Sequence, residues 1–205
     1  MRIVPVPIFT DILNHILEWF PEPVALYRGM PAKEYHSYVR MAQEGLRWPD
    51  VVTRIAGPAF DYRRLGRLYL RAARPDVSGQ EAVGWHREEM YGAPKGTLNF
   101  WMPVWGVTRG NTIKYIPGSE TAEIVTETVA GDVTKGSDGN EIGLLYAPKR
   151  IVSGVNFDDA RPLEVPYGYA AIFSGSLIHG AAQNNGDDIR FSVDFRIYPE
   201  GENGN

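Results

Sequence analysis

The chain of 205 residues contains no cysteine and four histidines, which are His15, His36, His86 and His179. The lack of cysteine excludes disulfides, thiolate metal sites, iron–sulfur clusters and cysteine nucleophiles. A metal centre must therefore combine histidines with carboxylates. His86 and Glu88 are one candidate pair, because residues two apart on a strand share a face, whereas Glu89 would point the opposite way, toward solvent. An imidazole beside a carboxylate offers two ligands to a divalent metal.

A third ligand is available in the second half of the chain. His179 follows a turn sequence, Ser174–Ser176, and stands in an apolar stretch predicted as a strand. Two histidines and one carboxylate on a β-scaffold form the facial triad of non-haem Fe(II) oxygenases, which leaves three positions of an octahedral metal for a 2-oxo acid and dioxygen. His15 and His36 fall on predicted helices and are interpreted as surface or core-edge residues.

An arginine in the last strand supplies a candidate anion site. Arg190 and Ser192 begin an alternating segment that ends at Tyr198. An arginine that faces a β-core needs an anionic partner, because an unpaired buried charge is very costly. A dicarboxylate cosubstrate would meet that need through a bidentate guanidinium contact, with the Ser192 hydroxyl beside it. We expect the turn over Asn184–Asp188 to pair this strand with that of His179 and to bring Arg190 close to it.

The elements that must position these residues change character after about residue 60. Before it, apolar side chains recur at helical spacing, which predicts one helix from Ile8 to Phe20 with Thr10 or Asp11 as N-cap. A second helix is predicted over Ala32–Leu46, with Pro31 at its first turn.

From Gly66 onward the apolar period is two, which predicts strands. The predicted strands cover 68–72, Ala82–His86, Thr97–Val104, Thr112–Ile116, Ile124–Val129, Leu144–Tyr146, Leu163–Val165, Ala170–Phe173, Leu177–Gln183 and Arg190–Tyr198. Many short strands, together with 22 glycines and 15 prolines that suit turns, indicate a β-sandwich or barrel.

The combination of His86-x-Glu88, His179 and Arg190-x-Ser192 resembles the motif set of the Fe(II)/2-oxoglutarate-dependent dioxygenases, and most of all their phytanoyl-CoA hydroxylase-like group. The segment Asn99–Trp105, followed by Gly110–Ser119, is similar to a strand–turn–strand of that group that ends in Pro-Gly-Ser/Thr-His. The resemblance spans Tyr69 to Tyr198. It implies a mainly β fold with a double-stranded β-helix (jelly-roll, cupin-like) core over 66–198 and flanking N-terminal α-helices over 1–60. We expect one domain over 1–205 with a disordered tail, 200–205.

The resemblance also implies an activity. Fe(II), O2 and 2-oxoglutarate as cosubstrate would hydroxylate a small metabolite or biosynthetic intermediate, with release of succinate and CO2. Two positions depart from the group's pattern. Glu88 stands where aspartate is usual, and because it keeps a carboxylate on the metal, hydroxylation remains favoured over halogenation. Glu120 replaces the final histidine of the Pro-Gly-Ser/Thr-His segment, a histidine that we interpret as structural.

Further residues are candidates for the pocket. We expect Asn99 and Lys114 to join Arg190 and Ser192 in binding the cosubstrate. Tyr69 and Arg71 share one strand face, as do Asn99 and Trp101. We expect the substrate side to be lined by Tyr69, Arg71 and Trp101. Within a basic stretch, Arg67 or Arg71 could meet an anionic group of the substrate. The polar loop Gly131–Gly143 is a predicted lid.

Two alternatives keep a β-fold. A cupin-type metal isomerase or epimerase usually has two histidines close together before the carboxylate, and it leaves Arg190 without a task. A non-catalytic ligand-binding sandwich would suit the five tryptophans and eleven tyrosines. The net charge of −4 argues against nucleic acid as partner, and no segment has the length of a transmembrane helix or the form of a signal peptide. A cytoplasmic protein with a small-molecule substrate is expected, and the sequence leaves its oligomeric state open.

Overall fold

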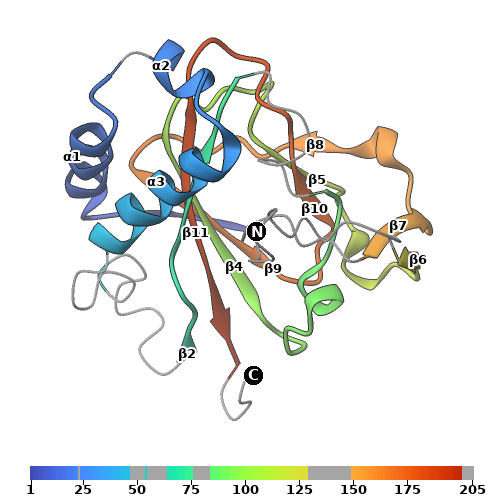
Figure 1. Cartoon of the computed structure of the whole chain (residues 1–205). Helices are drawn as coiled ribbons and strands as arrows, with labels where there is room; N and C mark the ends of the chain where they lie inside the picture. Colours follow the sequence, from blue (N-terminus) through green and yellow to red (C-terminus); the bar gives the residue numbers. More distant parts are fainter. Residues whose placement is uncertain (23, 47–53, 55–63, 76–83, 129–148, 200–205) are drawn as a thin grey trace.

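The computed structural model describes residues 1–22, 24–46, 54, 64–75, 84–128 and 149–199. Two antiparallel sheets pack face to face, and the N-terminal helices lie against the larger one (Figure 1). The helices are α1 (Phe9–Trp19), α2 (Val24–Arg28) and α3 (Ala32–Gly45). This arrangement confirms the predicted mainly β, jelly-roll fold with flanking N-terminal helices.

The larger sheet has the strand order β1-β9-β4-β11-β2, and β3 also pairs with β11. Its strands are β1 (Arg2–Pro5), β2 (Arg64–Leu65), β3 (Tyr69–Ala73), β4 (Leu98–Trp105), β9 (Tyr169–Ser174) and β11 (Arg190–Tyr198). The smaller sheet has the order β10-β5-β8, with β5 (Ile113–Tyr115), β8 (Arg161–Pro162) and β10 (His179–Ala181). A separate two-stranded ribbon joins β6 (Val125–Thr128) and β7 (Lys149–Ser153).

The central strand β11 shows why the sheet has two chemically different faces. Phe191, Val193, Phe195 and Ile197 are buried in the core that the sheet shares with the helices. The alternate residues from Arg190 to Arg196 line a cavity on the other face. The alternation read from the sequence is thus confirmed over the whole strand. Since one face must be apolar to hold the helices, the other is free to carry polar groups.

The helices follow the predicted apolar stripes but begin differently. α1 starts at Phe9 with Ile8 as N-cap, so the predicted capping by Thr10 or Asp11 is wrong, because both lie inside the helix. α3 starts after Pro31, and its stripe of Tyr35, Val39 and Ala42 is buried as predicted.

Several strands differ from the prediction. The strands β1, β2 and β7 were not predicted. The prolines that hid β1 are tolerated because it is an edge strand that pairs, among the described strands, with β9 alone. Strand β8 covers Arg161–Pro162, just before the predicted Leu163–Val165. Of the predicted strand Ala82–His86, the described residues 84–86 form no strand and contribute only an isolated bridge at His86, so this part of the prediction is wrong. Residues 82 and 83, all of Leu144–Tyr146, the predicted lid Gly131–Gly143 and the tail 200–205 lie outside the described residues.

The predicted pairing of the His179 strand with the Arg190 strand is wrong. β10 pairs with β5 in the smaller sheet, whereas β11 pairs with β3, β4 and β2 in the larger one. The connection between them crosses from one sheet to the other instead of closing a hairpin. His179 and Arg190 therefore meet across the cavity between the sheets.

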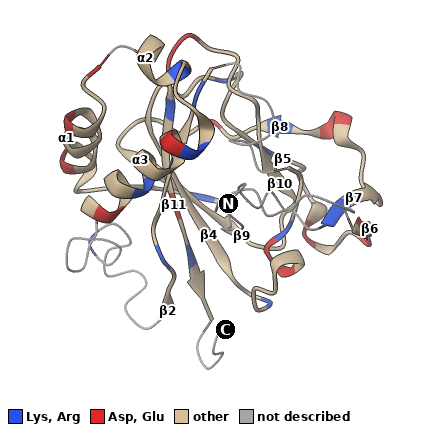
Figure 2. Cartoon of the chain, viewed as in Figure 1, with Lys and Arg blue, Asp and Glu red and all other residues tan. Residues whose placement is uncertain are grey.

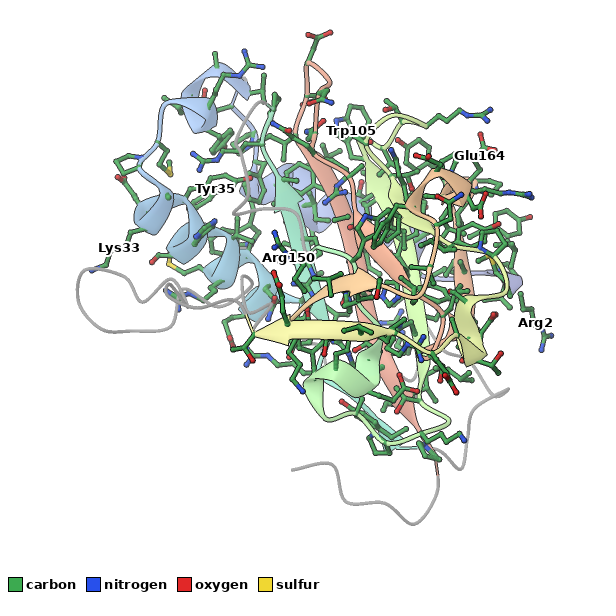
Figure 3. The ribbon with its side chains drawn as sticks, turned by 90° about the vertical axis from the view of Figure 1, so that its right-hand side faces the viewer. Arg2, Lys33, Tyr35, Trp105, Arg150 and Glu164 are labelled. Atoms are coloured by element: carbon green, nitrogen blue, oxygen red, sulfur yellow. The ribbon has the colours of Figure 1, made fainter. Side chains whose placement is uncertain are left out.

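The contact between α3 and β3 gives a first stability prediction. Tyr35 is fully buried between helix and sheet, and its hydroxyl donates to the carbonyl of Ala72 at 3.1 Å (Figure 3). We expect Tyr35→Phe to lower the free energy of unfolding by about 1–2 kcal/mol, because a buried carbonyl loses its partner. Urea unfolding would measure the loss. Tyr167→Phe is the control, since its hydroxyl donates to the carbonyl of Val107 at an exposed site. Equal losses in the two variants would contradict this account.

Candidate active site

Two histidines lie side by side at the edge of the smaller sheet, where His86 forms an isolated antiparallel bridge with His179 of β10. The N–H of His86 donates to the carbonyl of His179, and the reverse bond is also made, each at 2.9 Å. The Nδ1 atom of His86 lies 2.7 Å from the carbonyl of Gly84, and that of His179 lies 2.8 Å from the carbonyl of Leu177. Because a carbonyl can only accept, Nδ1 carries the proton in both rings, and each Nε2 is left as a metal ligand.

Glu88 reaches the same point from a 3-10 turn. After His86 the chain enters η2 (Glu88–Tyr91), so the prediction that one strand presents both side chains is wrong about the element. The two side chains nevertheless converge: Oε1 of Glu88 lies 3.7 Å from Nε2 of His86 and 3.5 Å from Nε2 of His179. Glu89, predicted to face solvent, is half-buried and accepts a hydrogen bond from the hydroxyl of Ser176.

The turn after β9 holds Glu88 in place. Its amide donates to the carbonyl of Gly175 at 2.8 Å, and the amide of Gly175 donates to the carbonyl of Thr97 at 2.8 Å. A Cβ atom at Gly175 would lie 3.1 Å from Cγ of Glu88 and 2.9 Å from the carbonyl oxygen of Thr97. Glycine is therefore required for this close approach. Ligand atoms of His86, Glu88 and His179 all lie within 4.8 Å of one another, and the three residues are buried.

The protonation states suit metal binding. Burial alone raises the pKa of Glu88, but interactions with His179, His86 and Arg196 outweigh it and hold that pKa well below its ordinary value. Burial, and then the neighbouring His179, lower the pKa of His86. The carboxylate is therefore ionised and the His86 imidazole neutral at neutral pH, as a metal requires. This donor set of two imidazoles and a carboxylate fits Fe(II).

The triad opens into a cavity of about 620 Å³ between the sheets. The predicted site residues that line it are His86, Glu88, His179, Arg190, Ser192, Asn99, Tyr69, Arg71 and Trp101. Nδ2 of Asn99 lies 3.3 Å from Nε2 of His179. Arg190 is only 2% exposed, and its Nη1 donates to the carbonyl of Asn111 at 2.7 Å. Residues from both sheets and both halves of the chain thus meet at one site.

Lys114 is not brought to the cavity. It follows Ile113, which does line the cavity, and pairs in register with Gly180 and Pro162 inside the smaller sheet. Since successive side chains of a strand point to opposite faces, Lys114 points away from the site. The structure gives no support to its predicted contact with the cosubstrate.

The arginines predicted to meet an anionic substrate have acidic partners in the protein. Arg71 makes a bidentate pair with Asp194, at 2.6 Å and 3.0 Å, and Arg67 pairs with Glu44 at 3.1 Å. The pair of Arg71 and Asp194 is only about one-fifth exposed. This arrangement reduces the positive charge that the substrate side offers to an anion.

Several cavity residues were not assigned from the sequence. Asp194 and Arg196 continue the polar face of β11, so the alternation that marked Arg190 and Ser192 could have marked them also. Tyr91 follows Glu88 by one turn of η2, and its buried hydroxyl has no hydrogen-bond partner among the described residues. Burial and the Glu88 carboxylate raise the pKa of Tyr91 to about 12. His36 of α3 also lines the cavity, a place that no local signal could show.

Solved structures of similar fold support this architecture. EvdO2 from Micromonospora carbonacea var. aurantiaca, complexed with 2-oxoglutarate, is 19% identical with a TM-score of 0.52, covering 82% of this chain and 67% of that one. A non-heme monooxygenase, ThoJ in its apo form, is 15% identical with a TM-score of 0.53, covering 96% and 73%. The chain thus spans about two thirds of the length of the first of these proteins.

Family membership follows from the sequence match. No curated protein sequence matches the chain. In the described residues no helix is long and apolar enough to cross a membrane. The family model of the phytanoyl-CoA dioxygenases (PhyH), however, matches residues 13–192, which include the triad and Arg190. Iron and 2-oxoglutarate are typical of that family, and the buried triad fits the metal. The chain therefore belongs to the phytanoyl-CoA dioxygenase family of the Fe(II)/2-oxoglutarate oxygenase superfamily.

Proposed function

We propose that the protein is an Fe(II)- and 2-oxoglutarate-dependent hydroxylase of a small metabolite or biosynthetic intermediate. The observation that carries this proposal is that a buried triad of two histidines and a glutamate opens into the same cavity as the buried Arg190. A metal position and a dicarboxylate position within one cavity are what a 2-oxo acid cosubstrate needs. A cupin-type isomerase would have no use for the second of them.

The residues of the site have separate roles in binding the metal and the cosubstrate. His86, Glu88 and His179 hold the metal. Arg190 binds the distal carboxylate of 2-oxoglutarate, with Ser192 as a hydroxyl partner and Asn99 beside the metal. When bound, iron supplies the activation of dioxygen, with 2-oxoglutarate oxidised to succinate and CO2. The retained carboxylate of Glu88 supports hydroxylation over halogenation.

The substrate side is aromatic and polar. Tyr69 and Trp101 contribute aromatic side chains to the cavity lining. The protonated hydroxyl of Tyr91 offers a hydrogen bond that no described residue satisfies. A buried hydroxyl without a partner costs free energy, which a substrate oxygen or nitrogen would recover. Acidic and basic residues are interspersed along the described ribbon (Figure 2), which supports a small molecule rather than nucleic acid as the partner.

Anaerobic titration tests the proposed function. We expect the Fe(II)-loaded protein to develop a weak visible charge-transfer band when 2-oxoglutarate is added, and to release succinate once oxygen is admitted with a metabolite mixture. Lys114→Ala should behave as the unaltered protein, because Lys114 lies outside the cavity lining. The absence of both the band and any affinity for 2-oxoglutarate would overturn the proposal. Metal-dependent turnover of a substrate without 2-oxoglutarate would instead support the isomerase alternative.

A further inference from the structure

The two oxygens of Glu88 have different surroundings. Oε1 faces Nε2 of both histidines, at 3.7 Å and 3.5 Å. Oε2 accepts a hydrogen bond from Nε of Arg196 at 2.5 Å. One oxygen is therefore presented to the metal position, and the other is held by a guanidinium group. The carboxylate is 2% exposed, so water does not compete for either oxygen.

Arg196 is itself held by a run of alternating charges. Its Nη1 lies 4.0 Å from Oδ2 of Asp194, which in turn makes the bidentate pair with Arg71. The guanidinium groups of Arg71 and Arg196 lie 4.9 Å and 5.8 Å from the centre of the Tyr69 ring. Charge-assisted pairs of this kind fix the position of a side chain more firmly than neutral hydrogen bonds do. These contacts therefore help to hold the guanidinium group of Arg196 against Glu88.

The sheet register adds a second contact with the triad. Arg196 on β11 lies opposite Asn99 on β4, and Asn99 contacts Nε2 of His179. One cross-strand pair therefore touches two of the three ligands. The larger sheet thus orients the ligands that the turn of η2 and the smaller sheet supply.

We propose that Arg196 is a positioning residue that withholds Oε2 of Glu88 from the metal and so keeps the carboxylate monodentate. This inference rests on the proposed function. Carboxylates can bind a metal through one oxygen or through two. Glu88 is one methylene longer than the aspartate usual in the resembled group, so it has more freedom to turn both oxygens toward the metal. A bidentate Glu88 would occupy one of the three positions that 2-oxoglutarate and dioxygen need.

Arg196→Met tests the inference, because methionine keeps much of the length but neither the charge nor the hydrogen bond. We expect the affinity for 2-oxoglutarate to fall roughly tenfold, about 1.4 kcal/mol, because Oε2 of Glu88 would then compete with the cosubstrate for a metal position. The affinity for the metal alone should not fall, because Glu88 then offers it both oxygens. Co(II) absorption of the metal-loaded protein should also change shape, since the d–d bands of Co(II) respond to coordination number. Arg196→Lys, which keeps a cation near Oε2, should restore part of the affinity for 2-oxoglutarate.

The control is Arg109→Met, which removes an arginine from an exposed pair with Glu164 and should change none of these readouts. Unchanged affinity for 2-oxoglutarate in Arg196→Met, or equal loss of metal and 2-oxoglutarate, would overturn the inference. If Arg196→Met does not fold, Arg196→Gln and Arg196→Lys decide by the same comparison. If the unaltered protein itself fails to bind 2-oxoglutarate, the proposed function has failed, and that result is distinct from the failure of this inference.

Discussion

Arg190→Met is expected to weaken 2-oxoglutarate binding by at least about thirtyfold, since removing one partner of a buried charge pair costs about 2–5 kcal/mol. Arg190 is among the largest fully buried side chains of the described protein. Its hydrogen bond to the carbonyl of Asn111 fixes one nitrogen of the guanidinium group. The planar fork is therefore oriented before the cosubstrate arrives, which favours bidentate binding of a carboxylate. Calorimetry on the metal-loaded protein without oxygen measures the affinity.

The same experiment separates binding from folding. Metal affinity should persist in Arg190→Met, because none of the three predicted ligands pairs with Arg190 in the described structure. Arg74→Met is the matched control: Arg74 is also buried, and it donates to the carbonyls of Tyr27 and Met30, outside the cavity lining. Arg74→Met should lower the stability of the protein but leave its affinity for 2-oxoglutarate unchanged. If Arg190→Met lowered the affinity for the metal as much as the affinity for 2-oxoglutarate, the role of this arginine would be structural.

Ligand types were easier to predict than the elements that carry them. The alternation of β11 is a local property, because side-chain direction on a strand follows from sequence position alone. The structure confirms it along the whole strand. The convergence of His86 and Glu88 depends instead on a 3-10 turn and on the carbonyl of Gly175, which lies far along the chain. Residue types constrained the chemistry, whereas the turn that assembles it depends on tertiary contacts.

Pairing between distant strands was the least predictable feature. A short polar connection between two strands usually indicates a hairpin, yet the connection after β10 crosses to the other sheet. The ion pair of Glu88 and Arg196 joins residues that are 108 positions apart. No pattern within one strand reveals such a pair. Arg71 shows the same limit: it lines the cavity, but no local pattern reveals that Asp194 is its partner.

His179→Ala is expected to have the largest effect on the metal. Nε2 of His179 lies 3.5 Å from Oε1 of Glu88, and its ring is oriented by the bond from Nδ1 to the carbonyl of Leu177. Removing a direct ligand should lower the affinity for the metal by more than the roughly 10- to 100-fold that is typical when a residue that only orients a ligand is lost. Because a metal bound only to the folded state stabilises it by about 2.7 kcal/mol at a hundred times the dissociation constant, added Co(II) should raise the Tm of the unaltered protein. In His179→Ala that rise should disappear.

His36→Ala provides the matched comparison for this loss. His36 and His179 are equally buried, at 7% exposure, and both line the cavity, but only His179 belongs to the cluster of ligand atoms. A general effect of removing a buried imidazole would lower the Tm of both variants without metal. Only the loss of a ligand would remove the response to Co(II) in His179→Ala and preserve it in His36→Ala. A Co(II) response that survives in His179→Ala would place the metal elsewhere and would remove the basis of the proposed oxygenase activity.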